Sequence, residues 1–153
     1  MKTLSQALLF RGLPEAALRK LASIAQERTL SNGAWLCHEG DDGDAMYVIA
    51  LGTVRVMRRD TSGKEQEVAT LGSGSCFGEM ALVLKDEKRA ASVVAQEPST
   101  ILELSREGLE KLCAEDDRFA HAFYKALARG LASRLQAASG DVAQYRTALL
   151  GRR

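Results

Sequence analysis

Short apolar runs separated by turn residues dominate the middle of the chain and limit the folds open to it. Between residues 34 and 104 the runs are AWLC, AMYVIAL, TVRVM, EQEVATL, AASVVA and TILEL. Short or alternating apolar runs of this kind are typical of β-strands. Turn pairs such as Asn32-Gly33 and Ser62-Gly63 recur about every ten residues, which favours an all-β sandwich or barrel over alternating strands and helices.

Helical spacing of apolar residues flanks this β region on both sides. Near the N-terminus it predicts one or two short helices before about residue 28. After residue 104 it predicts a first helix capped by Ser105 and a longer one over residues 116–139. The apolar stripe of the longer helix either packs on the sheet or forms a dimer seam.

Charge and length exclude several classes of protein. The chain has 21 basic and 20 acidic residues, so no global basic field attracts nucleic acid or an anionic membrane. No apolar run approaches the length of about 20 residues that spans a bilayer, and no signal peptide is recognisable, so we expect a cytoplasmic protein. The three cysteines and two histidines lie far apart, which predicts neither a disulfide framework nor a metal site.

One glycine-rich segment, GSGSCFGEMALVLKDEKRAASVV at residues 72–94, has the composition of an anion site. A helical turn formed by GEMAL would leave free N–H groups after Gly78, and such groups attract phosphate. The guanidinium of Arg89 could hold two phosphate oxygens, and the small residues after it would let the backbone approach a ligand. Glu79 can accept a hydrogen bond from a sugar hydroxyl, so the segment favours a sugar phosphate.

Each of these two charged residues also has an explanation that requires no ligand. A glutamate near a helix start is favourable in itself, so Glu79 could simply stabilise that helix. Arg89 is close in sequence to Asp86 and Glu87 and could form a solvated ion pair with either. The combination of the two residues with further motifs makes the binding site the stronger hypothesis.

Three motifs in a fixed order resemble the cyclic nucleotide-binding domain family. They are EGDDGDAMYVI at residues 39–49, FGEMAL at 77–82 and RAAS at 89–92. The similarity extends over about residues 8–139 and is to the ligand-binding domains of the bacterial catabolite activator protein and of cyclic AMP-dependent protein kinase regulatory subunits. It implies a mainly β (α+β) fold, a double-stranded β-helix or jelly roll with N-terminal helices and a C-terminal helical pair.

The resemblance also implies which residues bind the ligand. Arg89 would pair with the cyclic phosphate, Glu79 would bind the ribose 2′-hydroxyl, and Ser139 would meet the base across a dimer. Five further residues would supply backbone amides or a close backbone approach: Gly78, Met80, Ala81, Ala90 and Ala91. Members selective for cyclic GMP often carry a hydroxyl residue where this chain has Ala90, which favours cyclic AMP over cyclic GMP. Ala138 replaces a hydroxyl-bearing neighbour of the base-contacting residue.

The resemblance sets the expected domain boundaries. Only 14 residues follow Ser139, so we expect 140–153 to be a short tail with no DNA-binding domain. The preceding residues would form one cyclic nucleotide-binding domain, 1–139, which divides into N-terminal helices (1–28), a β jelly roll (29–104) with its phosphate-binding cassette (77–92), and C-terminal helices (105–139).

The sequence therefore predicts a non-catalytic, stand-alone sensor that binds a cyclic nucleotide and signals by moving its C-terminal helices. We expect a homodimer through helix 116–139, an effector protein of unknown identity, no nucleic-acid or membrane partner, no metal and no cofactor. Two alternatives stay open: a dimerisation scaffold of the same fold that binds no ligand, and a sensor of a different small effector. A jelly-roll enzyme is disfavoured because no metal ligands or catalytic triad can be assembled.

Overall fold

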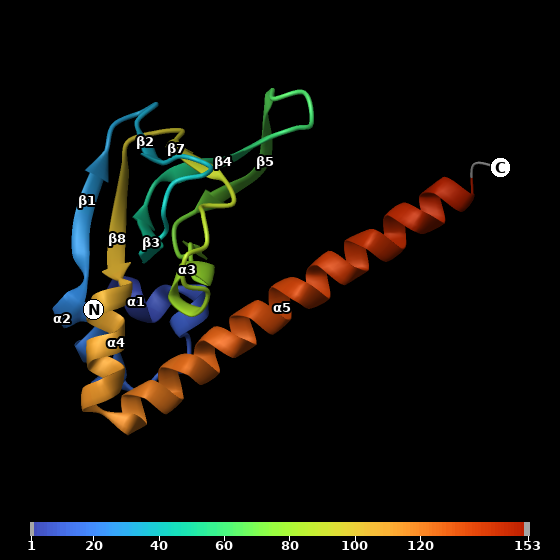
Figure 1. Cartoon of the computed structure of the whole chain (residues 1–153). Coiled ribbons are helices and arrows are strands. Elements are labelled where there is room, and N and C mark those ends of the chain that lie inside the picture. The colour runs from blue at the N-terminus through green and yellow to red at the C-terminus, as the bar shows by residue number, and fades with distance from the viewer. Residues whose placement is uncertain (1, 152–153) are drawn as a thin grey trace.

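The computed structural model describes residues 2–151, which form two antiparallel sheets with helices packed at one end (Figure 1). The strands are β1 (Gln26–Leu30), β2 (Trp35–Cys37), β3 (Ala45–Leu51), β4 (Thr53–Arg59), β5 (Glu65–Gly72), β6 (Cys76–Phe77), β7 (Ser92–Ala95) and β8 (Ser99–Ser105). One sheet has the strand order β1-β8-β3-β6 and the other β2-β7-β4-β5. The predicted β-sandwich with flanking helices is confirmed.

Apolar residues of both sheets form the core of the sandwich. Ile49, Val54, Ala95 and Ile101 are completely buried there. All six apolar runs identified in the sequence become strands, because antiparallel pairing satisfies their backbone groups. Side chains of β3, β7 and β8 enter the core, whereas β5 is largely exposed.

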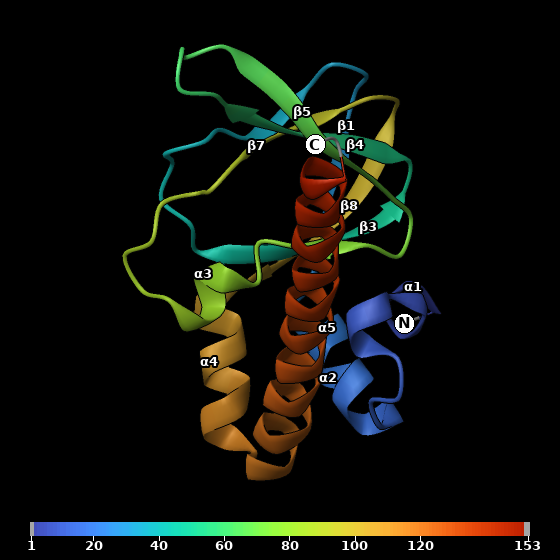
Figure 2. The same ribbon diagram turned by 90° about the vertical axis from the view of Figure 1, so that its right-hand side faces the viewer.

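A second core lies among the helices. The helical segments are α1 (Lys2–Gln6), the 3-10 turn η1 (Leu8–Phe10), α2 (Glu15–Ile24), α3 (Met80–Val83), α4 (Arg106–Glu115) and α5 (Asp117–Leu150). Phe10, Leu21 and Phe123 are almost fully buried in this core. Figure 2 shows α5 between α4 on one side and the N-terminal helices on the other.

Side-chain caps fix where the C-terminal helices begin. The hydroxyl of Ser105 accepts a hydrogen bond of 3.1 Å from the amide of Gly108, which confirms Ser105 as the N-cap of α4. Asp116 caps α5 and forms an ion pair with Lys20 of α2 at 2.8 Å. The hydrogen bond with Lys20 lowers the pKa of Asp116, so the cap is ionised at neutral pH.

Two element boundaries differ from the sequence expectation. The helical region expected to reach residue 28 ends at Ile24, and β1 follows; its first four residues are exposed, so they show no apolar alternation. The expected tail after residue 139 is helical through Leu150. Gly140 lies within this helix. A glycine there costs about 1 kcal/mol of helix stability relative to alanine, and this cost is too small to end the helix.

The C-terminal half of α5 projects from the body of the domain (Figure 1). The helix has 34 residues, and every residue from 132 to 150 is exposed. Leu135, Val142, Tyr145 and Leu149 are among the large apolar side chains left in solvent. Within the described range 2–151, no helix combines the length and apolar character that crossing a membrane requires.

The turn between β3 and β4 provides a test of the sandwich packing. Gly52 has φ +97°, and a Cβ added there would lie 2.8 Å from the Cα of Ser99. We expect Gly52→Ala to lower the free energy of unfolding by about 3 kcal/mol, because backbone strain adds to a steric clash. Gly63→Ala is the matched control: its φ is +82° with no atom within 4 Å, so strain alone should cost about 1–2 kcal/mol. Urea unfolding that gave equal losses would contradict the clash.

Candidate functional site

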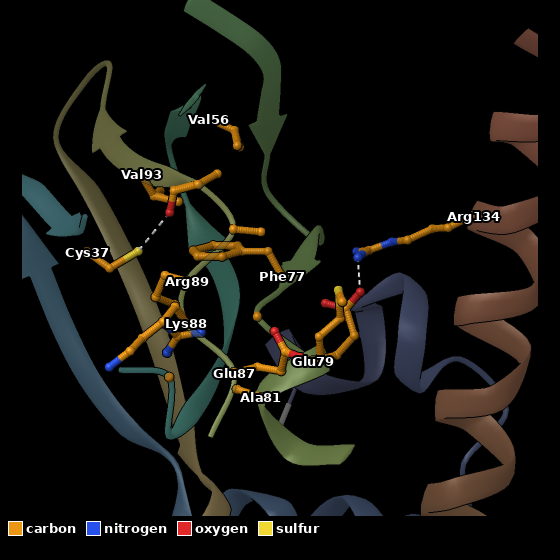
Figure 3. A pocket seen from close by; sticks show the side chains of 15 residues that line it. Cys37, Val56, Phe77, Glu79, Ala81, Glu87, Lys88, Arg89, Val93 and Arg134 are labelled. Carbon is orange, nitrogen blue, oxygen red and sulfur yellow. Dashed lines mark hydrogen bonds and ion pairs between the residues drawn. The ribbon is translucent and has the colours of Figure 1, made fainter. Parts of the chain in front are cut away.

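A cavity of about 190 Å³ lies beside α3, between the sandwich and α5 (Figure 3). Seven of the eight predicted ligand residues line it: Gly78, Glu79, Met80, Ala81, Arg89, Ala90 and Ala91. The eighth, Ser139, lies on the projecting part of α5, is exposed, and does not line the cavity within this single chain. Its expected contact across a dimer stays a prediction.

Two glycines let the Arg89 side chain enter the site. Gly78 has φ +78°, and a Cβ there would lie 2.7 Å from Nη1 of Arg89 and 3.0 Å from the Ala45 carbonyl oxygen. A Cβ at Gly43 would lie 3.4 Å from Cζ of Arg89. Any larger residue at position 78 would therefore push the guanidinium out of its place. The expected helical turn after Gly78 is confirmed as α3.

The guanidinium of Arg89 is half-buried and bonded to neutral groups. Its Nη2 donates to the Ala45 carbonyl at 2.9 Å and to the Tyr47 hydroxyl at 3.4 Å, and its Cζ lies 5.1 Å from the centre of the Tyr47 ring. Burial raises the pKa of Tyr47, so the phenol is neutral at physiological pH. Arg89 forms no ion pair with any residue from 2 to 151, so the proposed surface pairing with Asp86 or Glu87 is not present.

Glu79 is a buried carboxylate with only one oxygen satisfied. The residue is 5% exposed, and its Oε1 accepts from Nη1 of Arg134 on α5. Its Oε2 is buried and has no hydrogen-bond partner among the described residues. Glu79 precedes α3, but its side chain makes no capping hydrogen bond and is paired with Arg134 instead.

Arg134 is the main site residue that the sequence interpretation missed. It reaches from α5 across to Glu79, as Figure 3 shows, and its Nη2 also donates to the Cys76 carbonyl. No local spacing could have identified it, because 55 positions separate it from Glu79 and the contact exists only once α5 has packed. Its pairing brings a charged residue of the C-terminal helix into the lining of the cavity.

Part of the cavity wall away from Glu79 is apolar. Val56 and Val93 come from the β-sandwich, together with Cys37, whose thiol lies 3.9 Å from the Ala91 carbonyl oxygen. Burial raises the pKa of Cys37, although the nearby charge of Arg89 opposes that shift. The thiol is therefore neutral at pH 7, and the cavity combines an apolar side with a charged side.

Arg106 ties the site to the start of α4. Its Nε donates to the carbonyl of Ala81 at 2.6 Å, its Nη2 donates to the carbonyl of Gly43, and its backbone amide donates to the Asp44 carbonyl at 2.7 Å. One side chain thus connects α3, the loop before β3 and the first turn of α4. A displacement of α3 cannot leave the first turn of α4 unaffected while these bonds persist.

The fold is a β-sandwich with flanking helices, and seven of the predicted ligand residues line a cavity that the sandwich forms with the C-terminal helix α5. The chain belongs to the cyclic nucleotide-binding domain family, whose model matches residues 27–116. The family expected from the sequence motifs is therefore confirmed.

Relatives of known description support this membership. The chain is 38% identical over 123 residues to the cyclic AMP receptor protein of Thermus thermophilus, covering 80% of this chain and 56% of that protein. It is 36% identical to the cGMP-dependent protein kinase egl-4 of Caenorhabditis briggsae, covering 74% of this chain and 15% of the kinase. The chain thus spans about half or less of the length of these two relatives.

A solved structure supports the fold directly. The N-terminal domain of a transcriptional regulator from Streptomyces coelicolor superposes with a TM-score of 0.76 at 31% sequence identity. The match covers 88% of this chain and 94% of that structure.

Proposed function

We propose that this protein binds a cyclic nucleotide, with cyclic AMP preferred over cyclic GMP, and that it works as a non-catalytic regulatory module. The observation that carries the proposal is the free Oε2 of Glu79, since a buried carboxylate oxygen without a donor is costly. A ribose 2′-hydroxyl would supply that donor. The similarity to the cyclic AMP receptor protein of Thermus thermophilus supports the choice of ligand class.

Arg89 is the proposed partner of the cyclic phosphate. Its charge is half-buried and not neutralised by any carboxylate in residues 2–151, so an anionic ligand would complete its surroundings. The amide of Ala81 already donates to the Gly78 carbonyl at 3.1 Å. We therefore assign the backbone contacts with phosphate to the turn from Gly78 to Met80 and to Ala90, with Ala91 allowing close approach.

The size of the cavity favours a ligand-driven rearrangement. Its 190 Å³ is below the roughly 300–1,000 Å³ of ordinary small-molecule sites, so we expect a nucleotide to displace part of the wall. The wall includes Ala81, which is bonded to Arg106 of α4, and Arg134 of α5. Ligand binding would therefore shift the population of C-terminal helix positions, in proportion to its differential affinity for them.

The exposed face of α5 favours a homodimer. Leu131, Leu135, Ala138, Val142, Tyr145 and Leu149 follow one another at alternating intervals of four and three residues. This is the residue spacing of a coiled-coil seam, and it continues ten residues beyond the expected helix end. A dimer would bring Ser139 of one chain toward the cavity of the other, where it could meet the base. The stripe also favours the alternative function, a dimerisation scaffold that binds no ligand.

Calorimetric titration with cyclic AMP and cyclic GMP tests the ligand assignment. We expect Arg89→Ala to weaken cyclic AMP binding by about 2–5 kcal/mol, because a desolvated phosphate loses its charge partner. The exposed Arg58→Ala, on β4 and outside the cavity, should bind as tightly as wild type. Equal affinities of wild type and Arg89→Ala would refute the phosphate role, and a wild type that binds neither nucleotide would favour the scaffold.

Glu79 predicts discrimination against 2′-deoxy cyclic AMP. We expect the wild-type protein to bind the deoxy analogue at least about tenfold more weakly, because Oε2 would remain buried without a donor. In Glu79→Ala the two nucleotides should bind equally, since the group that distinguishes them is absent. A wild-type protein indifferent to the 2′-hydroxyl would remove Glu79 from the ribose site.

Sedimentation analysis tests the seam on α5. We expect wild type to be dimeric at micromolar concentration and Leu135→Glu to be monomeric, because two buried carboxylates would face each other in the seam. Gln136→Glu introduces the same charge one residue away and outside the stripe, and should remain dimeric. A wild-type protein that stays monomeric at every concentration would disprove the seam.

A further inference from the structure

A second hollow lies on the other side of Arg134, where η1, the chain between β5 and β6, and α5 meet. It encloses about 510 Å³, which is within the roughly 300–1,000 Å³ of small-molecule sites. Leu8, Leu9 and Leu71 give it an apolar side, and no acidic residue lines it within the described chain. Gly130 helps to form it, because a Cβ at that position would overlap the Leu9 side chain.

Three arginines line this hollow, which we call the arginine groove: Arg11, Arg129 and Arg134. Across residues 2–151, neither Arg11 nor Arg129 forms an ion pair. Ser75 and Ser133 add hydroxyl groups. Arg134 is paired with Glu79, but Arg11 and Arg129 have no carboxylate partner in residues 2–151, and a bound anion would supply one.

We infer that the arginine groove binds a small amphiphilic anion, with its carboxylate at the arginines and its apolar chain along the leucines. This site is distinct from the proposed nucleotide site, because Arg11 and Arg129 line only the groove. Arg129 and Ser133 lie on the face of α5 opposite the stripe of residues 131–149, as the 3.6-residue period requires. A dimer formed through the stripe would leave the groove open.

Arg134 couples the groove to the cavity beside Glu79, since it lines both. This coupling rests on the proposed nucleotide function. A carboxylate in the groove would compete with Glu79 for Arg134 and so disturb the contact that holds Glu79 in the nucleotide site; cyclic AMP and the amphiphile therefore bind antagonistically. Because linkage is reciprocal, each ligand weakens the other by the same factor.

Calorimetry with octanoate tests the groove, and octanol serves as the uncharged comparison. We expect octanoate to bind wild type, octanol to bind far more weakly, and Arg129→Glu to weaken octanoate binding at least about tenfold through loss of a charge-assisted hydrogen bond. Arg118→Glu is the matched control, because it reverses a charge on an exposed residue of the same helix outside both cavities. Equal octanoate affinity in wild type and Arg129→Glu would overturn the site.

Three further measurements complete the test. Arg11→Glu should weaken octanoate binding without changing cyclic AMP affinity, and circular dichroism checks that each variant is folded.

Saturating cyclic AMP should weaken octanoate binding by about fivefold or more. If octanoate binding does not change in a protein that binds cyclic AMP, the coupling is overturned. Octanoate binding without cyclic AMP binding would overturn the nucleotide function and support the groove. Binding of phosphatidylglycerol vesicles without binding of free octanoate would overturn the small-molecule assignment.

Discussion

A positive charge held partly inside a β-sandwich is the constraint on which the rest of the site depends. Burying a charged group is costly unless other groups compensate for its lost hydration. Here the Ala45 carbonyl and the ring of Tyr47 do so for Arg89, and the glycines at 43 and 78 leave the space that its guanidinium occupies. Since these partners are neutral, the charge remains available to a ligand.

The C-terminal helices are also joined to the site by arginine side chains. Arg106 of α4 is bonded to the carbonyl of Ala81, and Arg134 of α5 is paired with Glu79. The residues proposed to sense a ligand are therefore bonded directly to the elements proposed to report it. A separate chain of intermediate residues is unnecessary, because recognition and response share their hydrogen bonds.

The sequence predicted those parts of the structure that have a local cause. Apolar runs bounded by turns located six strands, Ser105 was recognisable as a cap, and the motifs around Glu79 and Arg89 located the cavity. β1 was missed because its exposed residues QERTL carry no apolar period. Arg134 was missed because its pairing with Glu79 is created by the packing of α5, a tertiary event that leaves no spacing in the sequence.

The projecting half of α5 has the geometry of a lever arm. From Arg134 to Leu150 the helix rises about 24 Å at 1.5 Å per residue. A tilt of about 5° at Arg134 would therefore displace the far end of the helix by about 2 Å. Breaking the single ion pair between Glu79 and Arg134 could thus produce a small tilt at the base of α5 and a larger displacement at its far end. A neighbouring molecule bound there would sense that displacement.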